Sequence, residues 1–187
     1  MTRTQVFACM AALAASACTP IPPSITAAEF ASETDEMVRA ADLSATALMD
    51  MPTSGVTTYA GTIAALGGSE SLMGSLTMDV DFATSDVTGS VTELNYVKNG
   101  TPDQTLGGSL TLTGEVSGTD LSANARGTLS GVQSGLRAKM NADIDLAGTF
   151  RNDTGTADLI YGTVDGEARG RFVDLDFNDG EFYATAQ

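Results

Sequence analysis

Apolar and polar residues alternate with a period of two along much of the chain after residue 55. The clearest case is the run SLTMDVDF at residues 75–82, in which every second residue is apolar. Successive side chains of a β-strand point to opposite faces of a sheet, so this run predicts a strand with one apolar and one polar face. Related patterns predict further strands at residues 56–66, 86–97, 109–116, 120–130, 143–150, 157–165, 168–177 and 181–186.

The predicted strands follow one another at hairpin spacing. Asn99-Gly100, Asp179-Gly180 and residues 152–155 contain the residue types that tight turns favour. An open antiparallel sheet leaves two edges with unpaired backbone groups, and closure into a barrel removes both. Glycines that would let a small barrel coil stand inside strands at positions 61, 89, 114, 127, 148 and 162. We therefore predict an all-β fold, a small soluble antiparallel up-and-down β-barrel of about eight strands over residues 53–187, with a two-sheet sandwich as the alternative.

Alternation alone does not say whether the apolar face points inward to a core or outward to lipid. A transmembrane barrel carries girdles of aromatic residues at both membrane surfaces. The chain has only 4 Tyr and no Trp. We expect the apolar face to point inward, and a transmembrane barrel is the alternative.

A short helix is predicted before the barrel. Thr26 and Ser32 are both of the type that caps helix N-termini, and acidic residues follow them. A weak apolar stripe at near-helical spacing is formed by Met37, Ala41, Ala45 and Leu48. We expect this helix to cover a barrel mouth or to lie along the barrel wall, and a disordered spacer is the alternative.

The N-terminus has the pattern of an export signal. Arg3 is followed by an apolar segment that is too short to span a bilayer, and the small residues 15–17 then precede Cys18. This arrangement resembles the bacterial lipobox, which implies removal of residues 1–17 and lipidation of Cys18 as the new N-terminus. The other cysteine, Cys9, lies in the segment to be removed, so no disulfide is expected. Ordinary cleavage before Cys18, which leaves a free thiol, is the alternative.

Residues 18–52 are expected to form a lipidated tether followed by the short helix. Prolines among residues 19–24 favour an extended segment. Thr19, rather than Asp, follows the cysteine, and by resemblance to other lipoproteins this favours the outer membrane. Lipid attached at Cys18 would then be the contact with the membrane. The formal net charge of −15 makes nucleic acid a poor partner, because nucleic acids are bound through clustered Lys and Arg.

The residues for common catalytic sites are missing from the chain. It contains no histidine, and Cys18 is the sole cysteine expected after processing, which excludes Ser-His-Asp and Cys-His nucleophiles and the usual zinc sites. The segment 174–180 begins like a calcium loop, but its glycine is one residue late and Thr185 stands where a glutamate is needed. Paired carboxylates are expected on the polar strand faces, in solvent, at Asp79/Asp81, Asp143/Asp145 and Asp174/Asp176. We predict a protein without catalysis, cofactor or metal.

The tyrosines are the remaining candidates for ligand contacts. Tyr59, Tyr96, Tyr161 and Tyr183 fall in predicted strands, where they would either supply binding contacts at the barrel rims or pack in the core. Tyrosine can also ligate ferric haem.

The barrel region resembles the β-barrel domain of transferrin-binding-protein-B-like surface lipoproteins. The similar pieces are residues 53–61, 80–82 with 87–91, 170–172 and 180–183. The resemblance implies an outer-membrane, surface-displayed lipoprotein that captures a nutrient carrier protein or helps to acquire iron or haem. Two departures are the presence of a single barrel without a handle domain and a last strand that lacks the Gly-Pro-x-Ala-x-Glu ending. A structural lipoprotein of the periplasmic envelope is the alternative function.

Overall fold

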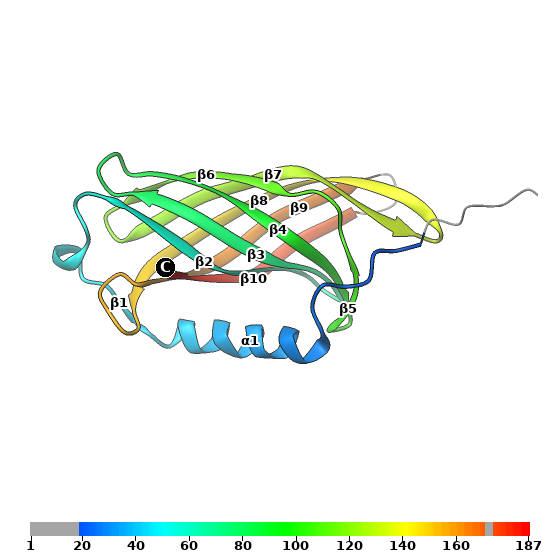
Figure 1. Cartoon of the computed structure of the whole chain (residues 1–187), viewed down its shortest axis with the longest axis horizontal. Helices are drawn as coiled ribbons and strands as arrows, with labels where there is room; N and C mark the ends of the chain where they lie inside the picture. The colour runs from blue at the N-terminus through cyan, green and yellow to red at the C-terminus, as the bar shows by residue number, and fades with distance from the viewer. Residues whose placement is uncertain (1–18, 171–173) are drawn as a thin grey trace, which may run out of the picture.

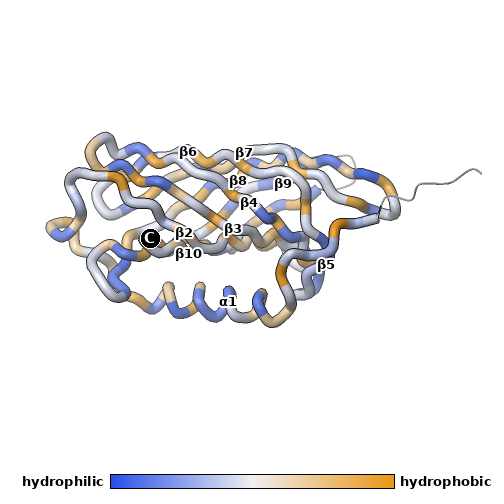
Figure 2. The backbone as a smooth tube through the Cα atoms, viewed as in Figure 1, coloured by the Kyte–Doolittle hydropathy of each residue, from blue (hydrophilic) through white to orange (hydrophobic). Residues whose placement is uncertain are grey.

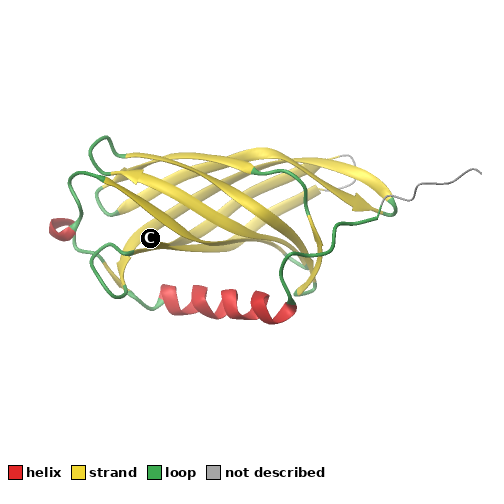
Figure 3. Cartoon of the chain, in the orientation of Figure 1, coloured by secondary structure: helices red, strands yellow, loops and turns green. Residues whose placement is uncertain are grey.

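The computed structural model describes residues 19–170 and 174–187. The chain enters through helix α1 (Ala27–Ala41), the two-residue strand β1 (Ser44–Ala45) and the short 3-10 helix η1 (Leu48–Asp50) (Figures 1 and 3). The other strands are β2 (Val56–Gly67), β3 (Glu70–Asp81), β4 (Asp86–Lys98), β5 (Thr101–Thr105), β6 (Leu110–Ser117), β7 (Asp120–Gln133), β8 (Leu136–Asn152), β9 (Leu159–Gly170) and β10 (Asp174–Ala186).

Eight strands form one closed antiparallel barrel (Figure 1). In order around the barrel these are β2, β3, β4, β6, β7, β8, β9 and β10. Strand β10 pairs with β2 from Glu181↔Ala64 to Ala186↔Tyr59, and this pairing closes the sheet. The predicted all-β up-and-down barrel is confirmed, and the two-sheet sandwich is wrong.

Several strands differ from those predicted; β3 and β8, for example, begin at Glu70 and Leu136 rather than at residues 75 and 143. The single strand predicted over residues 168–177 is divided between the end of β9 and the start of β10. Asp179-Gly180 is not a turn but part of an irregularity within β10, where the pairing with β9 shifts between Phe177 and Gly180. Asp179 has φ 68°, a value that suits a β-bulge as well as a turn, so the local signal was ambiguous. The short strand β5 was not predicted.

The apolar faces of the strands point into the barrel. In β8, for example, Met140, Ile144 and Leu146 are buried, whereas Asn141 and Asp145 between them are exposed. Alternation of apolar and polar residues is visible along the strands in Figure 2. The large buried side chains include Phe150, Phe177 and Phe182, which belong to one continuous core. This arrangement is the reverse of a transmembrane barrel, whose apolar band faces lipid.

Glycine is required where neighbouring strands approach most closely. A Cβ atom added at Gly162 in β9 would lie 2.1 Å from the carbonyl oxygen of Ala147 in β8. A Cβ at Gly61 in β2 would likewise lie 2.1 Å from the carbonyl oxygen of Tyr183 in β10. The glycines inside the strands therefore allow the tight coiling that closure demands.

Helix α1 lies along the outside of the barrel wall (Figure 1). It begins with a capping box in which Thr26 and Glu29 each bond the backbone N–H of the other, so Thr26 rather than Ser32 is the cap. Met37 is buried against an apolar patch on the outer wall that includes Met73 and Val97. The helix ends at Ala41, so the predicted continuation of its apolar stripe to Leu48 is wrong. Of the helices in the described parts of the chain, none is both long and apolar enough to cross a membrane.

The segment before α1 is attached to the barrel rather than free. The backbone N–H of Thr105 donates to the carbonyl of Ile21 at 3.0 Å, and the hydroxyl of Thr105 donates to the carbonyl of Pro22 at 2.9 Å. The backbone N–H of Ser24 donates to Oδ1 of Asn95 at 2.9 Å. The chain is therefore fixed to β5 and β4 from Ile21 onward.

The two ends of the barrel are distinct. The β5 end consists of the β2–β3, β4–β5 and β7–β8 connections with the start of β10. The η1 end consists of the β3–β4, β6–β7 and β8–β9 connections with η1. The chain enters at the β5 end, and α1 runs from there toward the η1 end (Figure 1).

We expect Gly162→Ala to lower the free energy of unfolding by about 1–3 kcal/mol, because the new methyl group must push β9 away from β8. Gly155→Ala is the matched control, since its nearest neighbour to an added Cβ is 3.4 Å away on the side chain of Asp158. Urea unfolding of both variants measures the difference. Equal stability of the two variants would contradict the close packing of β8 and β9.

Candidate functional site

A pocket opens in the mouth of the barrel at the β5 end, where the barrel wall is also interrupted. Strand β4 pairs with β6 along its first half and with β5 along its last residues. Strand β6 pairs with β7 as far as Thr111↔Arg126. Beyond that point, the backbone pairing between β7 and the segment before β6 is reduced in the described residues to the isolated bridge Gly107↔Ser130. Strand β5 thus diverges from β7 and leaves a gap in the wall.

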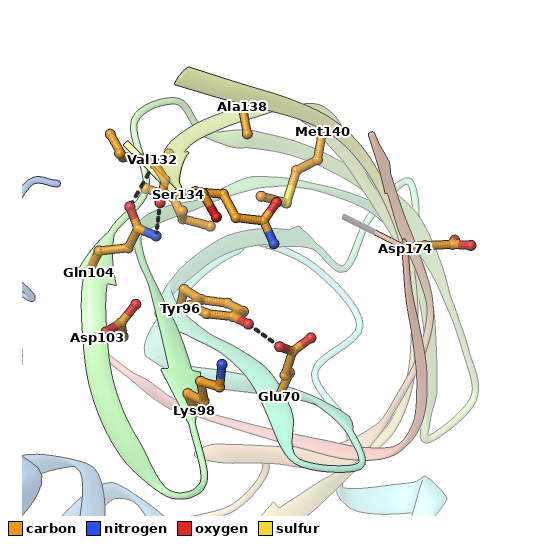
Figure 4. A pocket seen from close by; sticks show the side chains of 13 residues that line it. Glu70, Tyr96, Lys98, Asp103, Gln104, Val132, Ser134, Ala138, Met140 and Asp174 are labelled. Carbon is orange, nitrogen blue, oxygen red and sulfur yellow. Dashed lines mark hydrogen bonds between the residues drawn. The ribbon is translucent and has the colours of Figure 1, made fainter. Parts of the chain in front are cut away.

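The side chain of Gln104 spans this gap. Its Nε2 donates to the carbonyl of Val132 at 2.9 Å, and the backbone N–H of Val132 donates to its Oε1 at 2.9 Å (Figure 4). The side-chain amide thereby takes the place of a backbone partner from a neighbouring strand. Strands β5 and β7 therefore stay one side chain apart, and the backbone N–H and carbonyl of Val132 are still hydrogen-bonded.

The pocket has a volume of about 500 Å³, which lies within the usual size range for small-molecule sites. Its apolar surface comes mainly from Leu106, Ala138 and Met140. Its polar groups come from all sides of the opening and include Glu70, Tyr96, Lys98, Asp103, Gln104 and Ser134.

Tyr96 and Glu70 point toward each other across the floor of this opening (Figure 4). The phenol of Tyr96 donates a hydrogen bond to Oε1 of Glu70. Burial, and then the adjacent carboxylate, hold the pKa of Tyr96 well above its ordinary value. The phenol therefore stays protonated at neutral pH, as a hydrogen-bonding group and an aromatic surface rather than an anionic ligand.

The charges around the pocket favour a neutral or cationic ligand. Glu70 and Asp103 contribute carboxylates, and Lys98 contributes one positive charge. Asp174 also borders the pocket, but its side chain points away from the opening in Figure 4 and is paired with Arg169. A carboxylate beside an aromatic ring is a suitable environment for an amine or a quaternary ammonium group.

The other three predicted tyrosines lie elsewhere. Tyr59 is in the core, 1% exposed, and its hydroxyl donates to the carbonyl of Ala157 at 2.6 Å. Tyr161 is on the outer wall, where it donates to Glu181 at 2.7 Å and the guanidinium of Arg151 lies over its ring. Tyr183 is on the wall beneath α1. The structure does not bring the four tyrosines together, and of them only Tyr96 lines this pocket.

The paired carboxylates belong to polar networks on the outer wall. Asp143 and Asp145 both accept from Nδ2 of Asn124 at 2.7 Å, and Asp143 pairs with Arg126 at 3.0 Å. Among residues 19–170 and 174–187, no group of three or more His, Cys, Asp or Glu side chains is arranged to hold a metal ion. Cys18 lies outside the described residues.

Sequence reasoning missed Gln104, Leu106 and Met140 as parts of the site. Their convergence depends on the divergence of β5 from β7, which no local pattern reveals. The one available signal was Pro102, because proline cannot donate to a sheet ladder and occurs at edges or interruptions. Comparisons of the chain with models of protein families, with curated proteins and with solved structures find no match.

We expect the tyrosines to ionise at higher pH in the folded than in the unfolded protein. Burial raises the pKa of Tyr59 to about 12, and burial together with Glu181 raises that of Tyr161 to about 12. Because an unfolded tyrosine titrates near pH 10, the stability from these neutral phenols is fully present below about pH 10 and is lost as the pH rises toward about 12.

Absorbance at 295 nm, measured against pH with and without urea, tests this expectation. The native curve should lie at higher pH than the urea curve, and unfolding free energies should fall across the same window. Coincident curves would show that the phenols are not held as the structure has them.

Proposed function

We propose that this chain is an outer-membrane lipoprotein, displayed at the cell surface, whose barrel binds a small ligand without catalysis in the pocket at the β5 end. The observation that carries the binding proposal is the open pocket of about 500 Å³ in the barrel mouth at the β5 end. The observation that supports the anchor is the small-residue triplet before Cys18.

The ligand suited to this pocket is small, hydrogen-bonding, and neutral or positively charged. Glu70 and Asp103 offer acceptors and negative charge, and the ring of Tyr96 offers an aromatic face. Leu106 and Met140 provide apolar contact for the remainder of such a molecule.

A role in iron or haem acquisition is the biological setting that we propose, on the strength of the resemblance to transferrin-binding-protein-B-like lipoproteins. The pocket supplies one tyrosine for such a ligand, Tyr96, and its phenol is protonated at neutral pH. A haem group would therefore be held there by contact and hydrogen bonding rather than through a tyrosinate bond to iron.

We expect Cys18→Ser to move the protein from the membrane fraction to the soluble fraction, because the lipid would be the membrane contact. In intact cells, added protease should digest the wild-type barrel while a periplasmic control protein survives. Immunoblotting with an antibody against the barrel measures both results.

Two outcomes would contradict this proposal separately. Membrane retention of the Cys18→Ser variant would remove the lipid anchor. Protection of the wild-type barrel until the outer membrane is opened would remove surface display and favour a structural periplasmic lipoprotein.

We expect choline, used as a small cationic probe, to shift the methyl resonance of Met140 in the pocket and to leave that of Met78 in the core unchanged. Citrate, an anionic probe, should shift neither. Glu70→Gln should weaken choline binding roughly tenfold, the order of one charge-assisted contact. NMR titration of protein labelled at the methionine methyl groups measures each effect, with haemin run alongside.

The matched control is Glu181→Gln, because Glu181 accepts a hydrogen bond from Tyr161 on the outer wall as Glu70 does from Tyr96 in the pocket. It should leave the choline titration unchanged. Failure of all probes to shift Met140 would contradict the assignment of this pocket as the binding site.

A further inference from the structure

The point at which the chain joins the barrel restricts how an anchored barrel can be placed. Ile21 is paired with Thr105 in β5, and Pro22 and Ser24 are bonded to β5 and β4. Three peptide units separate Cys18 from Ile21, and at about 3.6 Å per residue they reach at most about 11 Å. A lipid on Cys18 would therefore lie close to the β5 end.

The opposite end is too far away to share that contact. Strand β4 has 13 residues and runs between the two ends. At about 3.3 Å per residue and a tilt of about 40°, it spans roughly 30 Å along the barrel axis. This length is several times the screening distance of about 8–10 Å at physiological ionic strength, so the charges of the two ends act on a membrane surface independently.

The charged residues are distributed unequally between the two ends. Among the described residues, the basic side chains at the β5 end are Lys98, Arg137, Lys139 and Arg169, and the acidic residues there include Glu29, Glu70, Asp103, Glu167, Asp174 and Asp176. Acidic residues at the η1 end include Asp42, Asp50, Asp81, Asp86, Glu115, Asp120, Asp153 and Asp158, with Arg39 and Arg151 as the basic side chains described there. The η1 end is strongly negative, whereas the β5 end has a smaller excess of acidic over basic side chains.

Anionic lipid repels the η1 end and tolerates the β5 end. At the β5 end, Leu136 at the tip of the β7–β8 hairpin is 58% exposed and is followed by Arg137. An apolar residue next to a basic one suits the boundary between headgroups and acyl chains. Exposed apolar residues also occur at the η1 end, at Leu48 and Met49, so apolar residues alone do not distinguish the two ends. The charge of each end and the point at which the chain enters the barrel distinguish them.

We propose that the barrel stands end-on at the bilayer, with the β5 end against the lipid surface and the acidic η1 end projecting away from it. This orientation rests on the proposed lipidation of Cys18. The pocket then opens toward the membrane, within the short gap that residues 19–21 allow. A small ligand can enter that gap, whereas a folded carrier protein cannot reach the pocket and would have to bind at the η1 end or on the wall.

The test uses the mature lipidated protein with one added cysteine, because Cys18 is the sole native cysteine after processing and its thiol would carry lipid. Thr101→Cys places a thiol in β5, and Thr84→Cys places one in the β3–β4 turn at the other end; both native residues are exposed. Each thiol is labelled with a nitrobenzoxadiazole fluorophore. The proteins are reconstituted in phosphatidylethanolamine and phosphatidylglycerol vesicles that contain a lipid with a nitroxide on its headgroup.

We expect the label at position 101 to lose most of its fluorescence in nitroxide vesicles, relative to vesicles without nitroxide, and the label at position 84 to keep its fluorescence. Equal quenching of both labels would mean that the barrel lies along the bilayer, and stronger quenching at position 84 would mean that it is inverted. Either result overturns the orientation.

Flotation of the vesicles separates this result from a failure of the anchor. Protein that floats with the vesicles but shows equal quenching leaves the lipid anchor intact and removes only the end-on orientation. Lipid-processed protein that does not float removes the anchor and the orientation together. The Cys18→Ser protein labelled at position 101 is the control, and it should neither float nor be quenched.

Discussion

Closure of the sheet by the pairing of β10 with β2 is the constraint on which the remaining structure depends. Once β10 and β2 pair, every strand of the barrel has two neighbours, and the apolar faces enclose a single core around residues such as Phe150 and Phe182. Closure requires the two backbones to approach so closely that Gly61 has no room for a side chain beside the carbonyl oxygen of Tyr183. Composition follows from this demand, because a small closed barrel needs glycine where strands cross closely and gains its core from aliphatic residues rather than tryptophan.

The wall of the barrel is interrupted at one place, beside the pocket. Between β5 and β6 the chain leaves the ladder, and the amide of Gln104 replaces the missing backbone partners of Val132. Buried polar side-chain atoms in the described residues all have hydrogen-bond partners, so the interruption leaves none of these atoms unpaired. The gap can remain open because the polar groups beside it are hydrogen-bonded. Buried groups left without partners would lower the stability of the fold.

The sequence predicts most of the barrel because a period of two reports which face of a strand is buried. Residues 75–82 illustrate this, since their perfect alternation matches the inward and outward positions of β3. The same pattern does not report which strands diverge, so β5 and the pocket could not be predicted. The period of two also does not say how far along the barrel axis an inward side chain lies. For this reason the sequence did not show that Tyr96 lines the pocket whereas Tyr59 lies in the core. Asp179-Gly180 shows a third limit, because a residue with positive φ serves a bulge and a turn equally well.

The N-terminal segment contacts the barrel at the closing pair of strands and next to the interruption of the wall. Glu33 of α1 accepts hydrogen bonds from Thr62 in β2 and from Tyr183 in β10, so the helix joins the two strands that close the sheet. The residues before the helix are bonded to β4 and β5, next to the interruption. The segment that would follow a lipidated Cys18 therefore continues into a helix that is hydrogen-bonded to both strands of the closing pair. One continuous stretch of about 25 residues thus joins the proposed membrane anchor to the open pocket and to the closing strands of the barrel, so a change in how this stretch docks should affect both the pocket and the closure.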